Sequence, residues 1–506
     1  MLLSAFDRRD FEHRTAVIFM DRHWTYGEIA AEGRRVCAGL QALGISKGDL
    51  VAFRLRNGPK FFAALLGCWW AGAVGAPIMV SESDTMAISW CNHLGVACLL
   101  LDESLVATIA PRLSELTSCR AVVSTAAASN TTGVHPWRAL VDNDENHERV
   151  GVDEREPVVI VHTSGTTARP KAVGQSRRAM NARARAQLEH LPFRPDDVVC
   201  VVTNCSHQFA LQSMVTPAFS LGAAVLLFPE FKPAQVLREM TKHGATVTNG
   251  YPAVLSALLE TARQDPRFCA PELRFAMSSS DKLPESLCGQ WQEVFDAPLL
   301  EGYGLSETCG NILFNRPGDH GVGTVGRPFP GVRIRIAGPD GEDVPDGTMG
   351  ELWCAGDFLF TGYWNDPDAT RRAMTEGWYR TGDQAIRDHD GRYRIVGRTG
   401  FVFKRGGIPV SPYEIESALA LHPAISDCLV IGVPSERWGK EAEAFLVLNQ
   451  TIPVGDLHAH AAALLGEPRR PVRFWSVPRI PRTPGGKVAR TDNDIGMLRV
   501  SAQLLT

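Results

Sequence analysis

The sequence predicts an α/β protein with a large N-terminal region of several subdomains and a small, mobile α+β C-terminal domain. Three observations support this class. Short apolar runs alternate with helix-like segments between residues 15 and 77, which predicts parallel-rich sheets. Short strands separated by turn residues dominate from about Gly331, which predicts a β-rich subdomain, and a smaller helix and strand unit follows Gly400. The predicted domains are residues 1–398 and 399–506.

The N-terminal alternation consists of apolar runs at residues 16–20 and 50–55 around a helix-like segment at residues 26–43. Residues 61–80 then carry no charge and are long enough to span a membrane. Helix breakers interrupt this stretch, so we predict a short buried helix ending near Gly72, then a turn and a buried strand. The breakers are Gly67, Gly72, Gly75 and Pro77.

Further along the chain, the same pattern returns and then changes. Apolar runs at residues 158–162, 198–203 and 223–228 predict more strands of the layered fold, in which ligands gather at the carboxyl ends of strands. The remaining predicted elements are strands at residues 332–336, 350–353 and 428–433, turns at 339–341 and 390–391, and a helix at 412–421.

Charge and cysteine content limit the possible partners. The 506 residues include 52 Lys and Arg against 56 Asp and Glu, a formal net charge of −4, so no basic field favours nucleic acid or an anionic membrane. The 12 cysteines are spaced singly without zinc-like clusters, and the N-terminus lacks the apolar core of a secretory signal. We therefore expect reduced thiols, a cytoplasmic location, no membrane span, and small molecules or proteins as partners.

The segment from His162 to Val173 is rich in Gly, Ser and Thr and includes Lys171. Small residues let backbone N–H groups and hydroxyls approach phosphate oxygens, and the lysine supplies a cation. The segment is not a Walker A loop, because Pro170 stands where a glycine is required and Ala172 where a magnesium-binding hydroxyl is required. This favours a polyphosphate site unlike that of ordinary ATPases and kinases, and an ordinary surface turn is the alternative.

This segment resembles the signature of the adenylate-forming superfamily, T-S-G-[ST]-T-G-x-P-K-G, with Ala168 and Ala172 in place of two glycines. The superfamily includes acyl-CoA synthetases, adenylation domains of peptide synthetases, and luciferases. The resemblance implies that the segment binds ATP and that Thr166 helps to hold Mg²⁺. The residues that it assigns to ATP here are Thr163, Ser164, Gly165, Thr166, Thr167 and Lys171.

Four further segments resemble the family's motifs and follow in the family's order. In residues 301–308 the resemblance implies that Tyr303 stacks on adenine, Ser306 approaches the α-phosphate and Glu307 holds Mg²⁺. Gly302, Gly304 and Ser280 are also assigned to the nucleotide, and Ser280 replaces a glycine common in the family. The other implied contacts are Asp383 with the ribose hydroxyls, Arg398 with ribose or phosphate, and Lys487 as the adenylation lysine.

Each motif also has an ordinary structural explanation when taken alone: a solvated Glu at a helix start, a simple turn at Asp383, or an exposed cationic loop around Lys487. Their common order over residues 162–490 favours the family. The implied chemistry has two steps, formation of an acyl-adenylate from ATP and transfer of the acyl group to the thiol of CoA or of carrier-bound phosphopantetheine. Gly400 stands at the family's hinge position, where Asp or Lys is usual. The catalytic candidates are Lys487, Lys171, Glu307 and His207.

The acyl pocket is expected to draw on residues 206–212, 249–251, 277–280 and 309–311. His207 would lie near the substrate carboxylate, with a core histidine as the alternative. Phe209 stands where peptide-synthetase adenylation domains place an Asp, so a substrate ammonium would lack its counter-charge. Polar candidates that could read a hydroxyl or amino substituent are Gln208, Gln212 and Asn311. The other candidates, any of which could instead be packing residues, are Phe209, Tyr251, Met277, Ser278 and Cys309.

The substrate expectation is an aryl or short-to-medium acyl acid. Two alternatives stay open: a stand-alone amino-acid adenylation enzyme that loads a carrier protein, and a homologue that binds nucleotide or acyl groups without turnover. The departures from the family pattern favour the second alternative, whereas the retained charged residues oppose it. The departures are Ala168, Ala172, Ser280 and Gly400.

Overall fold

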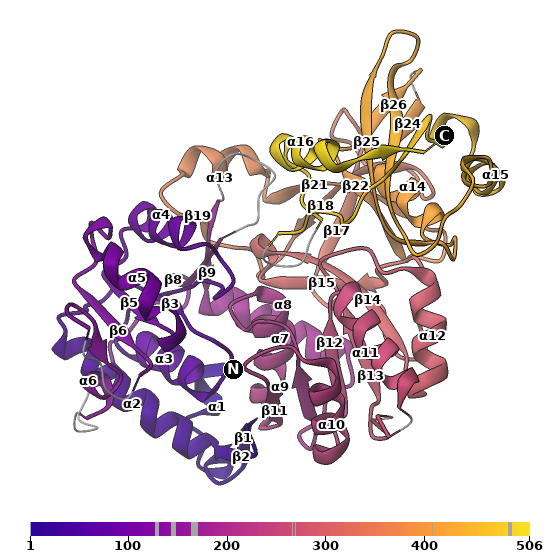
Figure 1. Ribbon diagram of the computed structural model, residues 1–506. Helices are drawn as coiled ribbons and strands as arrows, with labels where there is room; N and C mark the ends of the chain where they lie inside the picture. Colours follow the sequence, from indigo (N-terminus) through magenta and orange to yellow (C-terminus); the bar gives the residue numbers. More distant parts are fainter. Residues whose placement is uncertain are drawn as a thin grey trace.

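The computed structural model describes residues 2–126, 131–142, 148–162, 171–265, 267–268, 270–406, 408–483 and 488–505. Within these ranges the protein is a mixed α/β fold built on sheets of eight, nine, five and six strands. Figure 1 shows the first two sheets side by side with their helices, and the C-terminal strands and helices at the top of the view. The predicted fold class is confirmed.

The eight-stranded sheet has the order β19-β9-β8-β4-β3-β5-β6-β7. Its strands from β3 to β8 run parallel to their neighbours, and β9 and β19 close one edge in antiparallel pairing. The uncharged stretch forms a buried helix, a turn and β4, as predicted. The strands are β3 (Leu50–Arg54), β4 (Val74–Pro77), β5 (Cys98–Leu101), β6 (Ala121–Ser124), β7 (His135–Pro136), β8 (Pro157–His162), β9 (Ala172–Ser176) and β19 (Gly362–Tyr363). The helices of this region are α2 (Tyr26–Ala42), α3 (Pro59–Trp70), α4 (Asp84–Leu94), α5 (Val106–Ile109) and α6 (Arg138–Val141).

The nine-stranded sheet has the order β16-β15-β14-β13-β12-β10-β11-β1-β2. The first strand of the chain pairs antiparallel with β2 and parallel with β11, Val17 opposite Val225, so it belongs to this sheet and not to the eight-stranded one. Its other strands are β2 (Arg22–Thr25), β10 (Val198–Val201), β12 (Val247–Gly250), β13 (Phe275–Ser278), β14 (Leu299–Leu305), β15 (Gly310–Phe314) and β16 (Arg327–Pro328), with β1 at Thr15–Phe19 and β11 at Ala224–Leu227. The helices are α1 (Leu2–Ala5), α7 (Arg177–His190), α8 (Gln208–Ala210), α9 (Thr216–Leu221), α10 (Pro233–His243), α11 (Pro252–Gln264) and α12 (Glu285–Phe295).

A π-helical turn, η4 (Leu211–Val215), joins α8 to α9. Pro217 has no N–H to donate to the carbonyl of Ser213, four residues earlier. Instead, Nε2–H of Gln187 in α7 donates to the Ser213 carbonyl at 2.7 Å. Arg183 donates to the carbonyl of Gln212. Side chains of α7 therefore compensate for the irregular backbone that precedes α9.

The five-stranded sheet is the predicted β-rich subdomain, and the six-stranded sheet belongs to the C-terminal unit. The predicted domain boundary after Arg398 lies between the last strand of the former and the first strand of the latter, and it stays a prediction. The subdomain contains β17 (Arg333–Ala337), β18 (Met349–Ala355), α13 (Pro367–Ala373), β20 (Met374–Thr375), β21 (Trp378–Arg387) and β22 (Tyr393–Arg398). The C-terminal unit contains β23 (Phe403–Arg405), β24 (Ile408–Val410), α14 (Pro412–Leu419), β25 (Ile425–Ser435), β26 (Gly439–Leu448), α15 (Val454–Leu464), β27 (Arg473–Ser476), α16 (Asp492–Ser501) and β28 (Gln503–Leu504).

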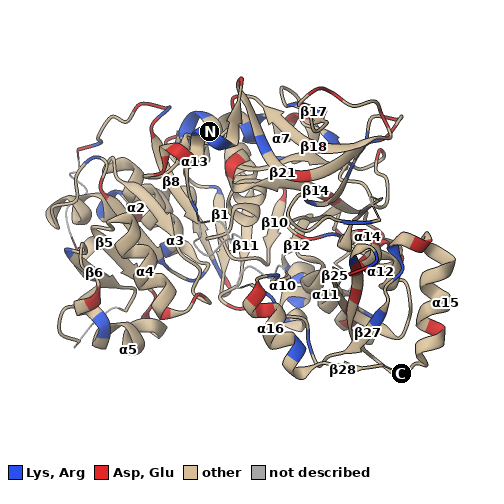
Figure 2. Ribbon diagram, turned by 90° about the horizontal axis from the view of Figure 1, so that it is seen from above, with Lys and Arg blue, Asp and Glu red and all other residues tan. Residues whose placement is uncertain are grey.

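Surface charge and helix length agree with the composition. Figure 2 shows basic and acidic residues interspersed over the elements of the protein. Among the described residues, we find no helix that combines the length and the apolar character needed to cross a bilayer. The uncharged stretch therefore belongs to the core, where Phe61 is fully buried.

Candidate active site

A cavity of about 570 Å³ opens where the two large sheets, the β-rich subdomain and the C-terminal unit meet. Thr483 and Val488 of the C-terminal unit line it together with β14, β21 and β22. The structure thus brings residues from widely separated motifs to one space. The predicted site residues that line the cavity are Lys171, His207, Gln208, Ser280, Gly302, Tyr303, Gly304, Ser306, Glu307, Asp383 and Arg398.

Asp383 is the centre of one wall of the cavity. The antiparallel register of β21 and β22 sets it opposite Arg398, whose Nε–H donates to Asp383 Oδ1 at 3.0 Å. The hydroxyl of Tyr303 donates to Asp383 Oδ2 at 2.6 Å. Each carboxylate oxygen keeps acceptor capacity beyond these bonds, so a diol in the cavity could donate to the same group. Burial is the largest cause that raises the pKa of Tyr303 well above its usual value, and the nearby Asp383 carboxylate is the second. The hydroxyl of Tyr303 therefore stays protonated.

Tyr303 lies in β14 between two glycines whose lack of a side chain is required by packing. A Cβ at Gly302 would lie 2.0 Å from the ring of Phe314, and one at Gly304 would lie 2.2 Å from the carbonyl oxygen of Gly310. These glycines allow β14 and β15 to pack closely while Tyr303 faces the cavity. Their close packing explains both glycines without any nucleotide contact.

Glu307, in the short 3-10 turn η5 (Ser306–Thr308), forms a second polar group with residues of the eight-stranded sheet. Its side chain is 7% exposed and its Oε1 accepts from the hydroxyl of Tyr363 at 2.9 Å. The ammonium of Lys171 lies 4.4 Å from the centre of the Tyr363 ring. A buried carboxylate that lines a cavity is a hard oxygen ligand of the kind that Mg²⁺ prefers, so the residues present fit a magnesium ion.

His207 caps α8 at its N-terminus, since its Nδ1 accepts from the N–H of Phe209 at 3.2 Å. In a neutral ring this places the proton on Nε2, the nitrogen that can donate. The ring also meets Tyr251 at right angles, with centroids 5.6 Å apart. His207 is therefore bonded to the backbone, and it is also half-buried and lines the cavity. Its place near the substrate carboxylate stays a prediction.

Other predicted pocket residues lie behind the cavity wall. Tyr251 is half-buried and tilts against Phe209, with ring centroids 6.2 Å apart. The roles of all these pocket residues toward the substrate acid stay predictions. The following predicted pocket residues are buried and do not line the described cavity: Phe209, Gln212, Met277, Ser278, Cys309 and Asn311.

Several predicted residues lie outside the described ranges: Thr163, Ser164, Gly165, Thr166, Thr167 and Lys487. Near the predicted hinge, Thr399 is tied to the large region, because its N–H donates to the carbonyl of Gly382 at 2.8 Å. A Cβ at the next residue, Gly400, would meet no atom within 4 Å. The chain is thus anchored up to Thr399 and unrestrained by side-chain packing one residue later.

Of the lining residues to which sequence reasoning gave no role, two lie directly beside predicted ones: Tyr363 and Glu301. Tyr363 contacts both Glu307 and Lys171, but it reaches them through the pairing of β19 with β9, Tyr363 opposite Val173, for which the sequence carries no local signal. Glu301 directly precedes the predicted nucleotide residues and lines the cavity, yet no role was assigned to it. Burial raises the pKa of the Glu301 carboxyl to about 8, and Oε1 accepts from the N–H of Leu283 at 3.1 Å.

Ser280 has a left-handed backbone, with φ of 78°. L-residues other than Asn and Asp rarely adopt this region, because Cβ approaches the following carbonyl oxygen. The position follows β13 and lines the cavity. A strained serine therefore stands at the edge of the candidate site.

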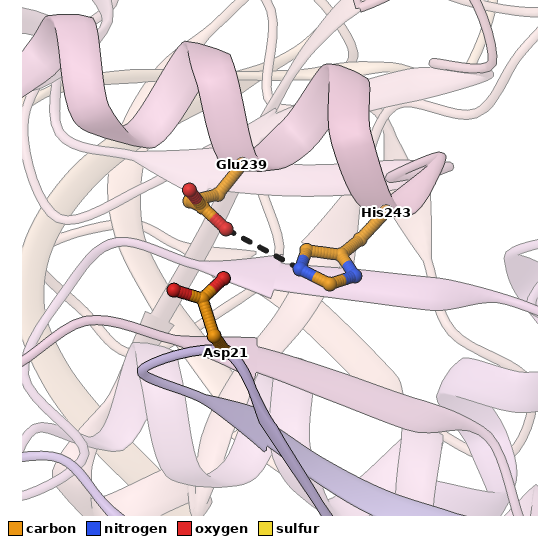
Figure 3. A group of neighbouring side chains, drawn as sticks. All are labelled: Asp21, Glu239 and His243. Carbon is orange, nitrogen blue, oxygen red and sulfur yellow. Dashed lines mark ion pairs between the residues drawn. The ribbon is translucent and has the colours of Figure 1, made fainter.

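A separate group of potential metal ligands, Asp21, Glu239 and His243, lies between the β1–β2 turn and the end of α10 (Figure 3). His243 Nε2 and Glu239 Oε2 are 3.3 Å apart. The ammonium of Lys242 pairs with Asp21 and lies 3.7 Å from Glu239. A side-chain cation already pairs with both carboxylates, so the group is explained as an ion-pair network.

Comparisons with known proteins agree with this geometry. The family model described as "AMP-binding enzyme" matches residues 6–364, and that of the "AMP-binding enzyme C-terminal domain" matches residues 414–487. The chain is 30% identical over 472 residues to a sulfoacetate–CoA ligase of Cupriavidus necator, covering 92% of this chain and 91% of that protein. It is 28% identical over 488 residues to an indoleacetate–CoA ligase of Aromatoleum aromaticum, covering 95% and 94%.

Among solved structures, ATP-bound MatB from Rhodopseudomonas palustris superposes with a TM-score of 0.87 at 25% identity, covering 99% of each chain. An anthranilate–CoA ligase in complex with anthranoyl-AMP superposes with a TM-score of 0.90 at 23% identity, covering 99% of this chain and 97% of that one, which supports the fold. With family models that match most of its length, a relative at 30% identity and the motif residues gathered at one cavity, this chain belongs to the AMP-binding enzymes of the adenylate-forming superfamily.

Proposed function

We propose that this protein is an acid–thiol ligase that activates a small carboxylic acid with ATP and passes the acyl group to the thiol of CoA. The proposal rests on one observation, namely that the same cavity is lined by Asp383, Arg398, Tyr303, Glu307 and Lys171. Its support from comparison is that the sulfoacetate and indoleacetate relatives are named as CoA ligases. Carrier-bound phosphopantetheine is the alternative acceptor, and a fatty acid–carrier-protein ligase of Streptomyces coeruleorubidus is 28% identical to this chain.

In the first step, a carboxylate oxygen of the substrate forms a bond to the α-phosphorus of ATP and the bond to pyrophosphate breaks. Asp383 would hold the ribose through its two hydroxyls, and Tyr303 would lie against adenine. Lys171 and Lys487 would counter the charge that builds on the phosphoryl oxygens, while the fixed positions of both reactants lower the barrier further. Mg²⁺, when held by Glu307, supplies a further positive charge beside the phosphates.

In the second step, the thiolate sulfur bonds to the acyl carbon and the bond from that carbon to AMP breaks. The C-terminal unit would rotate about Gly400 between the steps, moving Lys487 away and admitting the thiol. The anchored Thr399 followed by an unpacked glycine supports a hinge at this place. His207 Nε2 would donate to the substrate carboxylate at the wall of the cavity.

The proposed substrate is an aryl or short-to-medium acyl acid. The buried Phe209, in place of a carboxylate, argues against an ordinary α-amino acid, whose ammonium would lack a counter-charge. The retained Lys171, Glu307, Asp383 and Arg398 argue against a homologue without turnover. We also propose a cytoplasmic location. The 12 cysteines are scattered singly along the sequence, which is expected of reduced thiols in a reducing compartment rather than of a disulfide framework.

The test is exchange of labelled pyrophosphate into ATP across aryl, aliphatic and amino acids, with CoA consumption measured in parallel. Exchange that depends on one class of acid, with CoA consumed, is the expected result. Exchange without CoA consumption would indicate that the acyl acceptor of the second step is a carrier protein rather than CoA. Silence across the panel with demonstrated ATP binding would refute the proposal and support the non-catalytic alternative.

A further inference from the structure

Gln208 is a buried side chain of the cavity wall whose amide makes no hydrogen bond to the residues that the structure describes. It is 6% exposed, lies beside Ser206 and His207, and lines the cavity. Neither its Nε2 nor its Oε1 has a partner among the described residues. Buried amide groups are nearly always hydrogen-bonded in folded proteins, so the buried amide of a residue that lines a cavity requires partners that the described protein atoms do not supply.

The other buried glutamines of the described chain show the contrast. Gln175 donates to the carbonyl of Ser306 at 2.7 Å, and Gln187 donates to the carbonyl of Ser213 at 2.7 Å. Gln212 accepts from Thr216 Oγ1 at 3.4 Å. Each of these three has at least one structural bond and lies away from the cavity lining, although one amide atom of each has no partner among the described residues. Gln208 lies on the lining, and neither of its amide atoms has a partner among those residues.

Nor does local structure account for Gln208. The residue opens α8, and the capping bond there comes from His207 Nδ1 to the N–H of Phe209 rather than from the Gln208 side chain. Its amide presents an NH₂ group that donates and a carbonyl oxygen that accepts, side by side. A ligand that only accepts, such as a carboxylate or a sulfonate, would satisfy Nε2 and bring negative charge against Oε1. An apolar ligand would leave both atoms unpaired.

We propose that Gln208 selects acids that carry, besides the reacting carboxylate, a neutral group able both to donate and to accept, namely a hydroxyl or a carboxamide. This inference rests on the proposed ligase function and narrows its substrate class. Sites built to hydrogen-bond a polar substituent discriminate strongly against analogues that lack it, because the buried protein group is then left unpaired. Gln208 therefore acts as a specificity residue rather than a residue of the reaction itself.

The test compares kcat/KM in pyrophosphate exchange for matched acids that differ only in one substituent, a hydroxyl or carboxamide against a methyl group and against a second carboxylate. Wild-type enzyme should favour the neutral polar acid by ~10- to 100-fold over both the methyl analogue and the analogue with a second carboxylate. Gln208→Met, similar in length but without the amide, should reduce that preference to within ~3-fold.

Gln187→Met is the matched control, since Gln187 is also buried but lies away from the cavity lining. It should keep the wild-type preference even if it lowers the amount of folded enzyme, because a ratio of two substrates does not depend on that amount. Equal use of the three acids by wild type, or an unchanged preference in Gln208→Met, would overturn the inference and assign the Gln208 amide to water. Absence of exchange with every acid would instead refute the ligase function, and the inference with it.

Discussion

Replacing Ser280 with glycine should stabilise the protein, which is the opposite of the usual effect of introducing glycine. The left-handed backbone of Ser280, with φ of 78°, costs about 1–2 kcal/mol for an L-residue and nothing for glycine. Glycine loses about 0.5–1 kcal/mol more conformational freedom on folding. The net expectation for Ser280→Gly is a gain of roughly 0.5–1 kcal/mol in the free energy of unfolding.

Urea unfolding followed by tryptophan fluorescence measures this change. With a slope near the upper end of the usual 1–3 kcal/mol/M, the midpoint should rise by ~0.2–0.3 M with the slope unchanged. The control is Ser279→Gly, at a neighbouring residue that is 2% exposed and whose Oγ donates to Asn311 Oδ1 at 3.2 Å. It removes a buried hydrogen bond without relieving strain, so its midpoint should fall. A midpoint that falls equally in both variants would refute the argument from backbone strain.

Three further predictions concern the cavity. Asp383→Asn should raise the KM for ATP by ~10- to 100-fold, because bonds to a charged acceptor contribute about 1.5–3 kcal/mol, and an unchanged KM in initial-rate measurements would contradict a ribose contact. Lys487→Ala should slow adenylate formation by ~100-fold or more while sparing thiolation of supplied acyl-adenylate, and equal loss in both half-reactions would remove its assigned role. Burial raises the pKa of Glu301 from 4.5 to about 8, so its neutral form stabilises the wild type below pH 4.5 and this contribution is lost as the pH rises to about 8. Glu301→Gln should flatten that decline in urea midpoints between pH 5 and pH 8, and parallel declines in both proteins would count against it.

Local patterns in the sequence identified much of the fold. The alternation near the N-terminus predicted α2 and β3, and the spacing of glycines and Pro77 separated α3 from β4. These features depend on neighbours within one helix or strand, where hydrophobic period and backbone freedom are properties of the residues themselves. The five motifs also predicted that residues far apart in the chain meet at one site, and the described members do line one cavity.

Three features could not be predicted in this way, because each depends on contacts between distant segments. The first strand pairs with β11, about 200 residues later, although its sequence is equally compatible with the sheet that follows it. Tyr363 reaches Glu307 through the edge pairing of β19 with β9. The strained backbone of Ser280 was likewise invisible, since serine gives no signal for positive φ.

The sequence by itself therefore determined the family, the fold class and the charged residues that the family motifs bring to the site, because these are carried by residue type and spacing. Only the tertiary structure decided which side chains are satisfied there and which are not. Gln208 and Gln212 stand four residues apart in the same segment and were equal candidates for reading the substrate. Packing gives the Gln212 carbonyl a partner in Thr216, whereas among the described residues the amide of Gln208 has none, since hydrogen-bond satisfaction is a property of the assembled neighbours rather than of the residue.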